Sequence, residues 1–315
     1  MNKSSCPICA SDSTKVIYSA ARDYITGENF KVYTCNSCRI AYTFPMPSDL
    51  SAFYPEKYRH YNPLILIILE FLYNIRAQKW SGMFRVPGVA FEMGCGNGIM
   101  LKTLRQHGWQ VLGNERTVAA ADFARHKLRL PIFVGGIDSI NPTSFADLII
   151  LFQVLEHLQD PLSTLRQLNQ IIQPQGKLII AVPNFGAWQS KFGGEKWFHL
   201  DVPRHHFHFS LPALEFCLKE SGFEIVQVSF ASLEHDPFGW VQSILNRLYK
   251  KQNHLTRLLI GLDRPIITDT IHIGLAIAIW ILSLPMSVTS WIFQRGAIIE
   301  IVAQKSTLRK NLKQP

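Results

Sequence analysis

Charged residues are scarce in this chain of 315 residues, and acidic ones are scarcer than basic ones. Asp, Glu, Lys and Arg make up 17% of the sequence, with 23 acidic residues against 32 Lys and Arg, so the formal net charge is +9. So few charges are unusual for a freely soluble protein. The positive excess favours an anionic partner, such as a phosphate-bearing substrate or an acidic lipid surface. Nucleic acid is less favoured, because the sequence holds no recognition motif for it.

The N-terminus lacks the apolar run of a secretory signal peptide. Residues 1–10 are polar and include two cysteines, so we expect a cytoplasmic protein rather than a secreted one. The length allows one large domain and a small one, and a hydrophobic content of 47% is ample for a core.

Four of the six cysteines form two C-x2-C pairs, Cys6 with Cys9 and Cys35 with Cys38. Two such pairs can present four thiolates to one tetrahedral zinc ion, and the strand-like runs between them indicate a zinc ribbon. Two disulfides are the alternative, which a reducing compartment disfavours. Because all four thiolates would bind the zinc, we expect it to be structural rather than catalytic.

The central part of the chain alternates between strand-like and helical runs, which predicts an α/β fold with a parallel sheet covered on both faces. The expected strands are 89–91, 110–113, 131–134, 146–154, 177–182 and 223–230. The expected helices between them are 99–107, 117–128, 160–172 and 211–221. A ligand would then bind at the carboxyl ends of the strands.

Three glycines follow the first of these strands. Gly94, Gly96 and Gly98 begin two positions after Glu92 and precede a helical run. Glycines allow tight turns and a close approach of a ligand to the backbone, and the helix N-terminus offers free N–H groups. Glu115 ends the second strand, where a carboxylate can accept hydrogen bonds from both hydroxyls of a ribose. A nucleotide site is therefore predicted, and a glycine-rich turn without function is the alternative.

Position 99 separates two kinds of nucleotide site. The dinucleotide fingerprint needs glycine there, and the residue is Ile99. The spacing acid-x-Gly-x-Gly-x-Gly instead resembles the S-adenosylmethionine site of class I methyltransferases. This resemblance implies that Glu92 holds the donor's methionine amino group and that Glu115 binds its ribose. The other donor-site residues that it implies are Gly94, Cys95, Gly96, Asn97, Gly98, Gly136, Ile137 and Gln153.

Later motifs narrow the resemblance. The segment FQVLEHLQDP at 152–161 is followed by PQG at 174–176, AVPN at 181–184 and the block WFHLDVPRHHFHFS at 197–210. In this order they resemble a methyltransferase family related to the ubiquinone-pathway O-methyltransferases, whose members often carry a similar cysteine ribbon. The resemblance implies a seven-stranded Rossmann-like sheet, with 296–304 as its last strand, antiparallel to the sixth.

Methyl transfer is an in-line displacement that needs donor and nucleophile held collinear and water kept out. A hydroxyl nucleophile must also lose a proton, for which a histidine near its own pKa is suited. His157 and His205 are the candidates, although His157 could instead hold its loop through a structural hydrogen bond. The candidate substrate-binding residues are Trp197, Asp201, Arg204 and His208.

Two of these assignments have alternatives. Arg204 could pair with a substrate phosphate or carboxylate, or it could form a surface ion pair. The histidines of segment 205–208 point in different directions on an extended chain and lack an obvious carboxylate set, so a catalytic metal is not expected.

An apolar insertion separates the sixth and seventh strands. An amphipathic helix is expected over 238–248, and residues 270–294 contain no Asp, Glu, Lys or Arg. The length suits a membrane span, but one crossing would put the flanking strands on opposite sides, and Pro285 should divide the run. We expect contact with one membrane leaflet, as for a peripheral or monotopic protein. A lid over the pocket, a dimer interface and a true transmembrane helix are the alternatives. A helix over 64–80 either covers the core or dips into the same surface.

The sequence thus predicts an S-adenosylmethionine-dependent methyltransferase, O-directed, with a small-molecule, glycan or lipid-linked acceptor. A non-catalytic binding protein of the same fold, a nicotinamide oxidoreductase and a nucleic-acid methyltransferase are the alternatives, in falling order. The expected parts are a zinc ribbon (1–45), a linker with a covering helix (46–82), the methyltransferase core (83–231), the insertion (232–295), the last core strand (296–305) and a basic tail (306–315).

Overall fold

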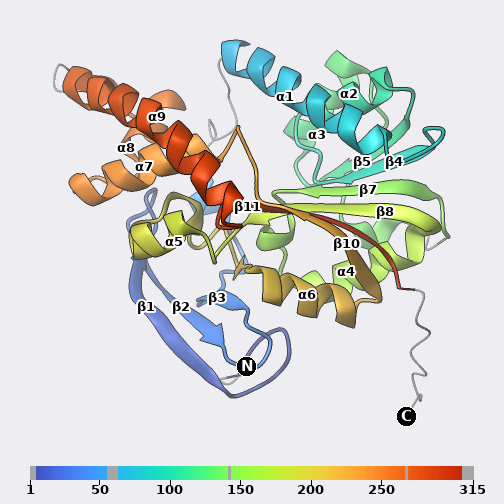
Figure 1. Cartoon of the computed structure of the whole chain (residues 1–315), viewed down its shortest axis with the longest axis horizontal. Helices are drawn as coiled ribbons and strands as arrows, with labels where there is room; N and C mark the ends of the chain where they lie inside the picture. Colours follow the sequence, from blue (N-terminus) through green and yellow to red (C-terminus); the bar gives the residue numbers. More distant parts are fainter. Residues whose placement is uncertain (1–4, 55–62, 141–142, 267–268, 307–315) are drawn as a thin grey trace.

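Two sheets organise the chain (Figure 1). The computed structural model describes residues 5–54, 63–140, 143–266 and 269–306. One sheet has seven strands in the order β10-β11-β8-β7-β4-β5-β6, and the other has four in the order β1-β2-β3-β9. The predicted basic tail lies, from residue 307 onward, outside the described residues.

The seven-stranded sheet confirms the predicted α/β class. Its strands are β4 (Val89–Met93), β5 (Gln110–Glu115), β6 (Ile132–Val134), β7 (Ala146–Phe152), β8 (Ile172–Pro183), β10 (Phe223–Ser229) and β11 (Ile298–Lys305). The last strand, β11, lies between β10 and β8 and runs antiparallel to both, whereas the other neighbours pair in parallel. The predicted pairing of the last two strands is therefore confirmed.

Helices cover both faces of this sheet because its strands alternate between two apolar cores. Phe91 and Ile149 belong to one core, with α4 (Pro161–Ile171) and α6 (Leu211–Glu220). Ala90 and Ile150 belong to the other. The helices that pack on this second core are α1 (Pro63–Ser81), α2 (Ile99–Gln106) and α3 (Val118–Leu128). In sheets of this kind a ligand binds at the carboxyl ends of the parallel strands.

The four-stranded sheet joins the N-terminal ribbon to the core. Its strands are β1 (Thr14–Arg22), β2 (Asn29–Cys35), β3 (Ala41–Phe44) and β9 (Phe207–His208). The short β9 belongs to the histidine-rich block that follows β8, and it pairs antiparallel with β3, with Ala41 opposite His208 and Tyr42 opposite Phe207. The ribbon is therefore part of the wall of the core domain rather than a separate appendage.

The insertion between β10 and β11 forms three helices, α7 (Asp236–Leu248), α8 (His254–Leu259) and α9 (Asp269–Ile292). The prediction that Pro285 divides the apolar run is wrong, because α9 continues through it. A proline inside a helix costs about 3 kcal/mol. Packing of α9 against α7 offsets this cost, with Ala276 and Ile279 buried against Val241 and Leu245.

Candidate active site

The loop between β4 and α2 has a backbone that favours glycine. Gly94, Gly96 and Gly98 have φ of 67°, 53° and 76°, in the left-handed region. A Cβ on Gly94 would lie 2.8 Å from Cγ2 of Val154, in the turn after β7. The loop is therefore in close contact with the end of the neighbouring strand, and it presents bare backbone to a ligand.

Glu92 lies under this loop and is buried, with 5% of its surface exposed. Its Oε2 atom is buried and has no hydrogen-bond partner in the described structure. Burial, and next the charge of Glu115, raise the pKa of Glu92 to about 8. An isolated buried carboxylate is unfavourable unless a cation or donor pairs with it. A ligand with an ammonium group would supply that partner.

Glu115 is held at the tip of β5 by backbone donors. Its Oε2 accepts a hydrogen bond from Gly96 N at 3.0 Å, and its Oε1 accepts one from Arg116 N at 2.9 Å. Asn114, which the sequence analysis missed, accepts from Gly94 N at 3.2 Å and donates to the Gly135 carbonyl at 2.8 Å. These bonds tie together the ends of β4, β5 and β6.

The other predicted donor-site residues line the same edge of the sheet. Gly136 and Ile137 follow β6, and Ile137 is buried at the start of the short helix η2 (Ile137–Ser139). Gln153 directly follows β7 with a φ of 56°, and its Nε2 is buried with no partner in the described structure. Cys95 and Asn97 belong to the glycine loop itself, and Cys95 N donates to the Asn114 carbonyl at 3.0 Å.

Both predicted bases meet beyond β7, although 48 positions separate them in the sequence. His157 ends the short helix η3 (Leu155–His157), and its ring centroid lies 4.6 Å from that of His205. His157 Nδ1 lies 2.8 Å from the Arg204 carbonyl, and His205 Nδ1 lies 2.9 Å from the His199 carbonyl. A carbonyl only accepts, so each Nδ1 carries the proton and each neutral ring has its lone pair on Nε2. Burial, and next His157, lower the pKa of His205 well below its usual value.

Glu156 lies beside these histidines, and the sequence analysis gave it no role. It is 1% exposed, and neither carboxylate oxygen has a hydrogen-bond partner in the described structure. Burial raises its pKa to about 8. One ligand atom from each of Glu156, His157 and His205 lies within 4.8 Å of the others. No spacing rule could have found this group, because the fold brings two distant segments together.

Arg204 lies within the protein rather than at its surface. Its guanidinium is fully buried and lies 2.8 Å from Asp23 of the ribbon and 2.6 Å from Asp201. It also donates to the Phe53 carbonyl at 2.9 Å. Burial acts to raise the pKa of Asp201, but Arg204 and His205 override it and lower that pKa to about 2.

The remaining candidate substrate residues also lie against the ribbon. His208 Nε2 is 3.0 Å from Thr43 Oγ1 in β3, and Trp197 is buried in an apolar cluster with Phe30 and Val32 of β2. The ribbon thus supports the histidine-rich block through a buried ion pair, hydrogen bonds and apolar packing.

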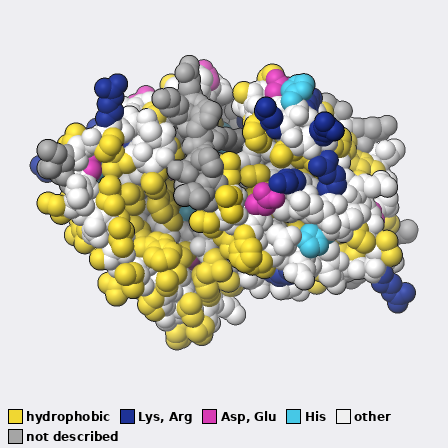
Figure 2. Space-filling model, turned by 90° about the horizontal axis from the view of Figure 1, so that it is seen from above, with side chains coloured by type: hydrophobic (Ala, Val, Ile, Leu, Met, Phe, Trp, Pro, Cys, Tyr) yellow, Lys and Arg dark blue, Asp and Glu magenta, His cyan; other side chains and the backbone are white. Residues whose placement is uncertain are grey.

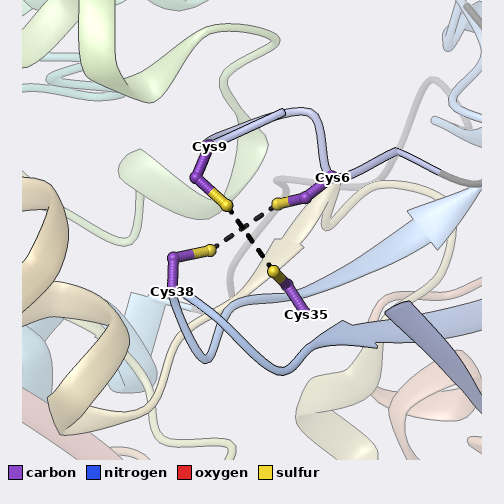
Figure 3. A group of neighbouring side chains, drawn as sticks. All are labelled: Cys6, Cys9, Cys35 and Cys38. Atoms are coloured by element: carbon purple, nitrogen blue, oxygen red, sulfur yellow. Dashed lines mark hydrogen bonds between the residues drawn. The ribbon is translucent and has the colours of Figure 1, made fainter. Parts of the chain in front are cut away.

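The four ribbon cysteines converge, as Figure 3 shows. The Sγ atoms of Cys6 and Cys38 are 3.6 Å apart, and those of Cys9 and Cys35 are also 3.6 Å apart. Zinc bonds to sulfur at about 2.3 Å, so tetrahedral ligands are separated by about 3.8 Å. These two separations are close to that value, so the four thiolates could hold a zinc ion.

Comparison with known proteins identifies the family of this chain. A family model described as a methyltransferase domain matches residues 71–228, half of the chain. Similar curated proteins include the ubiquinone biosynthesis O-methyltransferase of Bradyrhizobium diazoefficiens. It is 27% identical over 38% of this chain and 48% of its own length. That of Vibrio cholerae O1 El Tor is 28% identical over 43% of this chain and 58% of that protein. The chain spans about half the length of the curated relatives it matches.

Solved structures similar to this chain include an S-adenosylmethionine-dependent methyltransferase from Archaeoglobus fulgidus, with a TM-score of 0.49 and 16% identity over 78% of this chain and all of that one. The family match covers β4 to β10 and includes the glycine loop, Glu92 and Glu115. It confirms the resemblance seen in the sequence. The chain therefore belongs to the methyltransferase-domain family, and its core is an S-adenosylmethionine-dependent methyltransferase fold.

Proposed function

We propose that this protein is an O-methyltransferase that uses S-adenosylmethionine and acts on a small, lipid-linked acceptor at a membrane surface. The observation that carries the proposal is the buried, unpartnered oxygen of Glu92 beneath a loop of left-handed glycines. A sulfonium donor with an α-ammonium group fits this pair, because the ammonium satisfies the carboxylate and the bare loop admits the chain of the ligand.

Each residue at the sheet edge has a task in this proposal. S-adenosylmethionine supplies an electrophilic methyl group on a sulfonium. Glu92 pairs with its ammonium group. Glu115, whose Oε1 accepts from Arg116 and Thr117 and whose Oε2 accepts from Gly96, is held at the strand tip to face the ribose hydroxyls. Gly136 and Ile137 border the adenine. The turn with Gln153 and Val154 closes the loop on the side toward the acceptor.

On the acceptor side, we assign proton removal to His157 and His205. Both rings carry their lone pair on Nε2 when neutral. The lowered pKa of His205 keeps that ring neutral near pH 7. A neutral imidazole accepts the proton of a hydroxyl as its oxygen attacks the methyl carbon. Asp201, Arg204, Trp197 and His208 position the histidine-rich block through their contacts with one another and with the ribbon.

His157→Ala is expected to lower turnover about 100-fold, because a positioned base contributes at least that much. The affinity for S-adenosylhomocysteine should stay within a factor of about two, since Glu92 and Glu115 are untouched. Turnover is measured by transfer of a labelled methyl group to a membrane-extract acceptor, and affinity by calorimetry. His126→Ala, on the exposed face of α3, is the matched control. Full activity of His157→Ala would leave His157 only a structural role.

We assign structural zinc to Cys6, Cys9, Cys35 and Cys38. Cys38→Ser should remove one zinc per chain and lower the melting temperature by roughly 5–10 °C, because metal binding and folding of a ribbon are coupled. Cys217→Ala changes a buried cysteine outside the cluster and should leave the zinc content unchanged. Elemental analysis and thermal unfolding of the purified variants measure both quantities. Wild-type protein without zinc would contradict the assignment.

The membrane part of the proposal rests on α9, whose polarity is reversed relative to a helix of a soluble protein. Apart from Ile279, its buried residues are small or polar and include His272, Ser283 and Ser287, whereas Ile277 and Ile281 are 59% and 60% exposed. Figure 2 shows hydrophobic side chains gathered on this face of the molecule. The other exposed large apolar residues of α9 are Ile271, Ile273, Trp280, Leu282, Leu284, Val288 and Ile292. An apolar outer face fits lipid rather than water.

Both ends of α9 are attached to the same body, which favours contact with one leaflet over a crossing. By length and composition it is the one described helix that could cross a membrane. At its start, Asp269 Oδ1 lies 2.7 Å from His254 Nε2, and α8 is tied to the ribbon by a bond from Arg257 to the Tyr24 carbonyl at 2.8 Å. At its end, Trp291 donates to Asp236 at 2.7 Å. A crossing would have to separate these contacts.

A second helix, α1, exposes apolar side chains on the same side of the molecule. In Figure 1, α1 and α9 both lie at the top, and α1 exposes Ile67, Ile68 and Phe71 by 66%, 58% and 64%. Lys250, Arg264 and Arg295 are exposed near the ends of the insertion helices. Apolar faces flanked by basic residues suit an anionic lipid surface.

Calorimetric titration with S-adenosylhomocysteine, with NAD as the control, tests the donor assignment. Micromolar binding of the former alone supports it, and binding of NAD alone would favour a nicotinamide oxidoreductase. Methyl transfer to a lipid-extract acceptor then separates an enzyme from a binding protein of the same fold. A folded protein that binds donor product but transfers no methyl group to any extract would contradict catalysis.

A further inference from the structure

We propose that His235, which the insertion supplies, binds the methyl acceptor by accepting a hydrogen bond from one of its hydroxyl groups at Nε2. The residue directly precedes α7, and the sequence analysis gave it no role. The assignment rests on the proposed function, because it concerns the acceptor of that reaction. It adds a recognition residue to the two histidines that we assign to proton removal.

His235 lies beside the carboxyl end of β7. Its ring centroid is 5.8 Å from that of Phe152, the last residue of this strand. Two positions further along the chain, Val154 packs against the glycine loop. On another side, the ring of His235 is 6.3 Å from that of His199, whose carbonyl lies 2.9 Å from His205 Nδ1. His235 is therefore placed between the strand end that borders the donor loop and the segment that carries a proposed base.

The hydrogen bonds of Ser232 fix the tautomer of His235. Ser232 Oγ lies 3.1 Å from Glu234 Oε2 and 3.0 Å from His235 Nδ1. Although burial opposes it, the charges of His235 and Arg76 lower the pKa of Glu234, which is therefore ionised. A hydroxyl has one proton and a carboxylate only accepts, so Ser232 donates to Glu234 and accepts from His235. Neutral His235 thus carries its proton on Nδ1 and its lone pair on Nε2.

Helix α1 holds this arrangement in place through Arg76. The Nε atom of Arg76 donates to Glu234 Oε1 at 2.7 Å, and its guanidinium also pairs with Glu300 of β11. Arg76 is therefore occupied by two carboxylates and is not the group that meets a ligand. Among the described residues, none is a hydrogen-bond partner of His235 Nε2. The side chain of His235 is partly exposed, so a ligand can reach the ring.

The protonation state of His235 decides whether it can accept. Burial, joined by the charge of Arg76 and opposed by that of Glu234, lowers the pKa of His235, so the ring is neutral at pH 7. A neutral imidazole accepts a hydrogen bond from a hydroxyl, and an imidazolium only donates. The neighbouring His199 stays neutral in weak acid, because burial lowers its pKa to about 3. A loss of acceptor binding in weak acid is then expected to follow His235.

Two variants of His235 separate hydrogen bonding from packing. His235→Phe keeps a ring against Phe152 but has no lone pair, and it should raise the apparent KM for the acceptor about 10-fold at pH 7.5. The value of kcat should stay within a factor of about two. His235→Gln offers an oxygen acceptor, and its KM should stay within about threefold of the wild-type value. Transfer of a labelled methyl group to a membrane lipid extract, dispersed at a series of dilutions, measures both constants.

The pH dependence of KM gives a readout that a packing role would not change. Between pH 7.5 and 5.0 the KM of the wild type should rise about threefold or more relative to that of His235→Gln, because glutamine does not take up the proton. His126→Phe, on the exposed face of α3, is the matched control and should behave as the wild type.

An unchanged KM in His235→Phe would overturn the proposal. Equal losses in both His235 variants, with the pH dependence of the wild type, would also overturn it. Titration with S-adenosylhomocysteine separates these results from failure of the proposed function, since all of these proteins should bind it alike. A wild type that binds no S-adenosylhomocysteine, or transfers no methyl group, would overturn that function and the role of His235 with it.

Discussion

Gly96→Arg is expected to lower the affinity for S-adenosylhomocysteine at least about 1,000-fold, which is about 4 kcal/mol. Gly96 has a φ of 53°, and its N–H donates to Glu115 Oε2 at 3.0 Å. A long side chain at this position fills the space in which we propose that the methionine and ribose of the donor lie. It also strains the backbone that orients Glu115. Calorimetric titration of both proteins measures the change.

Gly261→Arg is the matched control for this variant. Gly261 also has a left-handed backbone, with a φ of 72°, but an added Cβ would meet nothing within 4 Å. The two variants therefore share the backbone penalty and the added charge, and they differ in the surface that the side chain meets. Unchanged binding in Gly96→Arg, from folded protein, would remove the donor site from this loop.

The sequence was sufficient to predict the large sheet, because its strands are continuous apolar runs bounded by turn residues. The cores on the two faces take alternate residues of each strand, as Ala90 and Phe91 show. Glycine spacing located the loop, because the left-handed φ of Gly94, Gly96 and Gly98 is a local backbone requirement. Local requirements of this kind leave a local signal.

Contacts between distant segments left no such signal. Arg204 pairs with Asp23, and Thr43 meets His208, across separations of more than 160 residues. In the sequence, Arg204 is only a cation near histidines. It could therefore pair with a substrate anion or form a surface ion pair. Its full burial follows from the addition of β9 to the ribbon sheet. That pairing depends on the tertiary fold rather than on periodicity.

The continuity of α9 could not be predicted for a different reason. Proline removes one backbone hydrogen bond and its cost is well known, but the compensating packing on α7 comes from other residues. Ala276 and Ile279 are buried there. The sequence showed an apolar run without charges, and only the fold shows which face of the run is covered.

That uncovered face leads to the second large expected effect. The double variant Ile277→Glu with Ile281→Glu should weaken binding to vesicles of anionic phospholipid about 1,000-fold. The two side chains are one helical turn apart and 59% and 60% exposed. Burying an isoleucine in an apolar environment is worth about 2 kcal/mol, so loss of both accounts for about 4 kcal/mol. Co-sedimentation with vesicles measures the change.

Val16→Glu with Val226→Glu is the control, because it adds the same charges at apolar residues that are 45% and 52% exposed on β1 and β10. It should bind vesicles as the wild type does. Binding of S-adenosylhomocysteine should be unchanged in both double variants, since neither touches the glycine loop. Equal vesicle binding by Ile277→Glu with Ile281→Glu would contradict lipid contact. A sedimentation measurement would then show whether the same face joins two copies of the chain.

Salt dependence separates the two forces that hold the protein to lipid. Attraction of Lys250, Arg264 and Arg295 to anionic headgroups weakens as ionic strength rises, because the screening length falls to about 8 Å at 0.15 M. Insertion of Ile277 and Ile281 does not weaken in this way. The wild type should therefore keep part of its vesicle binding in high salt, whereas the double variant should lose all of it. Such an outcome would place the apolar face of α9 in the leaflet and its basic flanks at the headgroups.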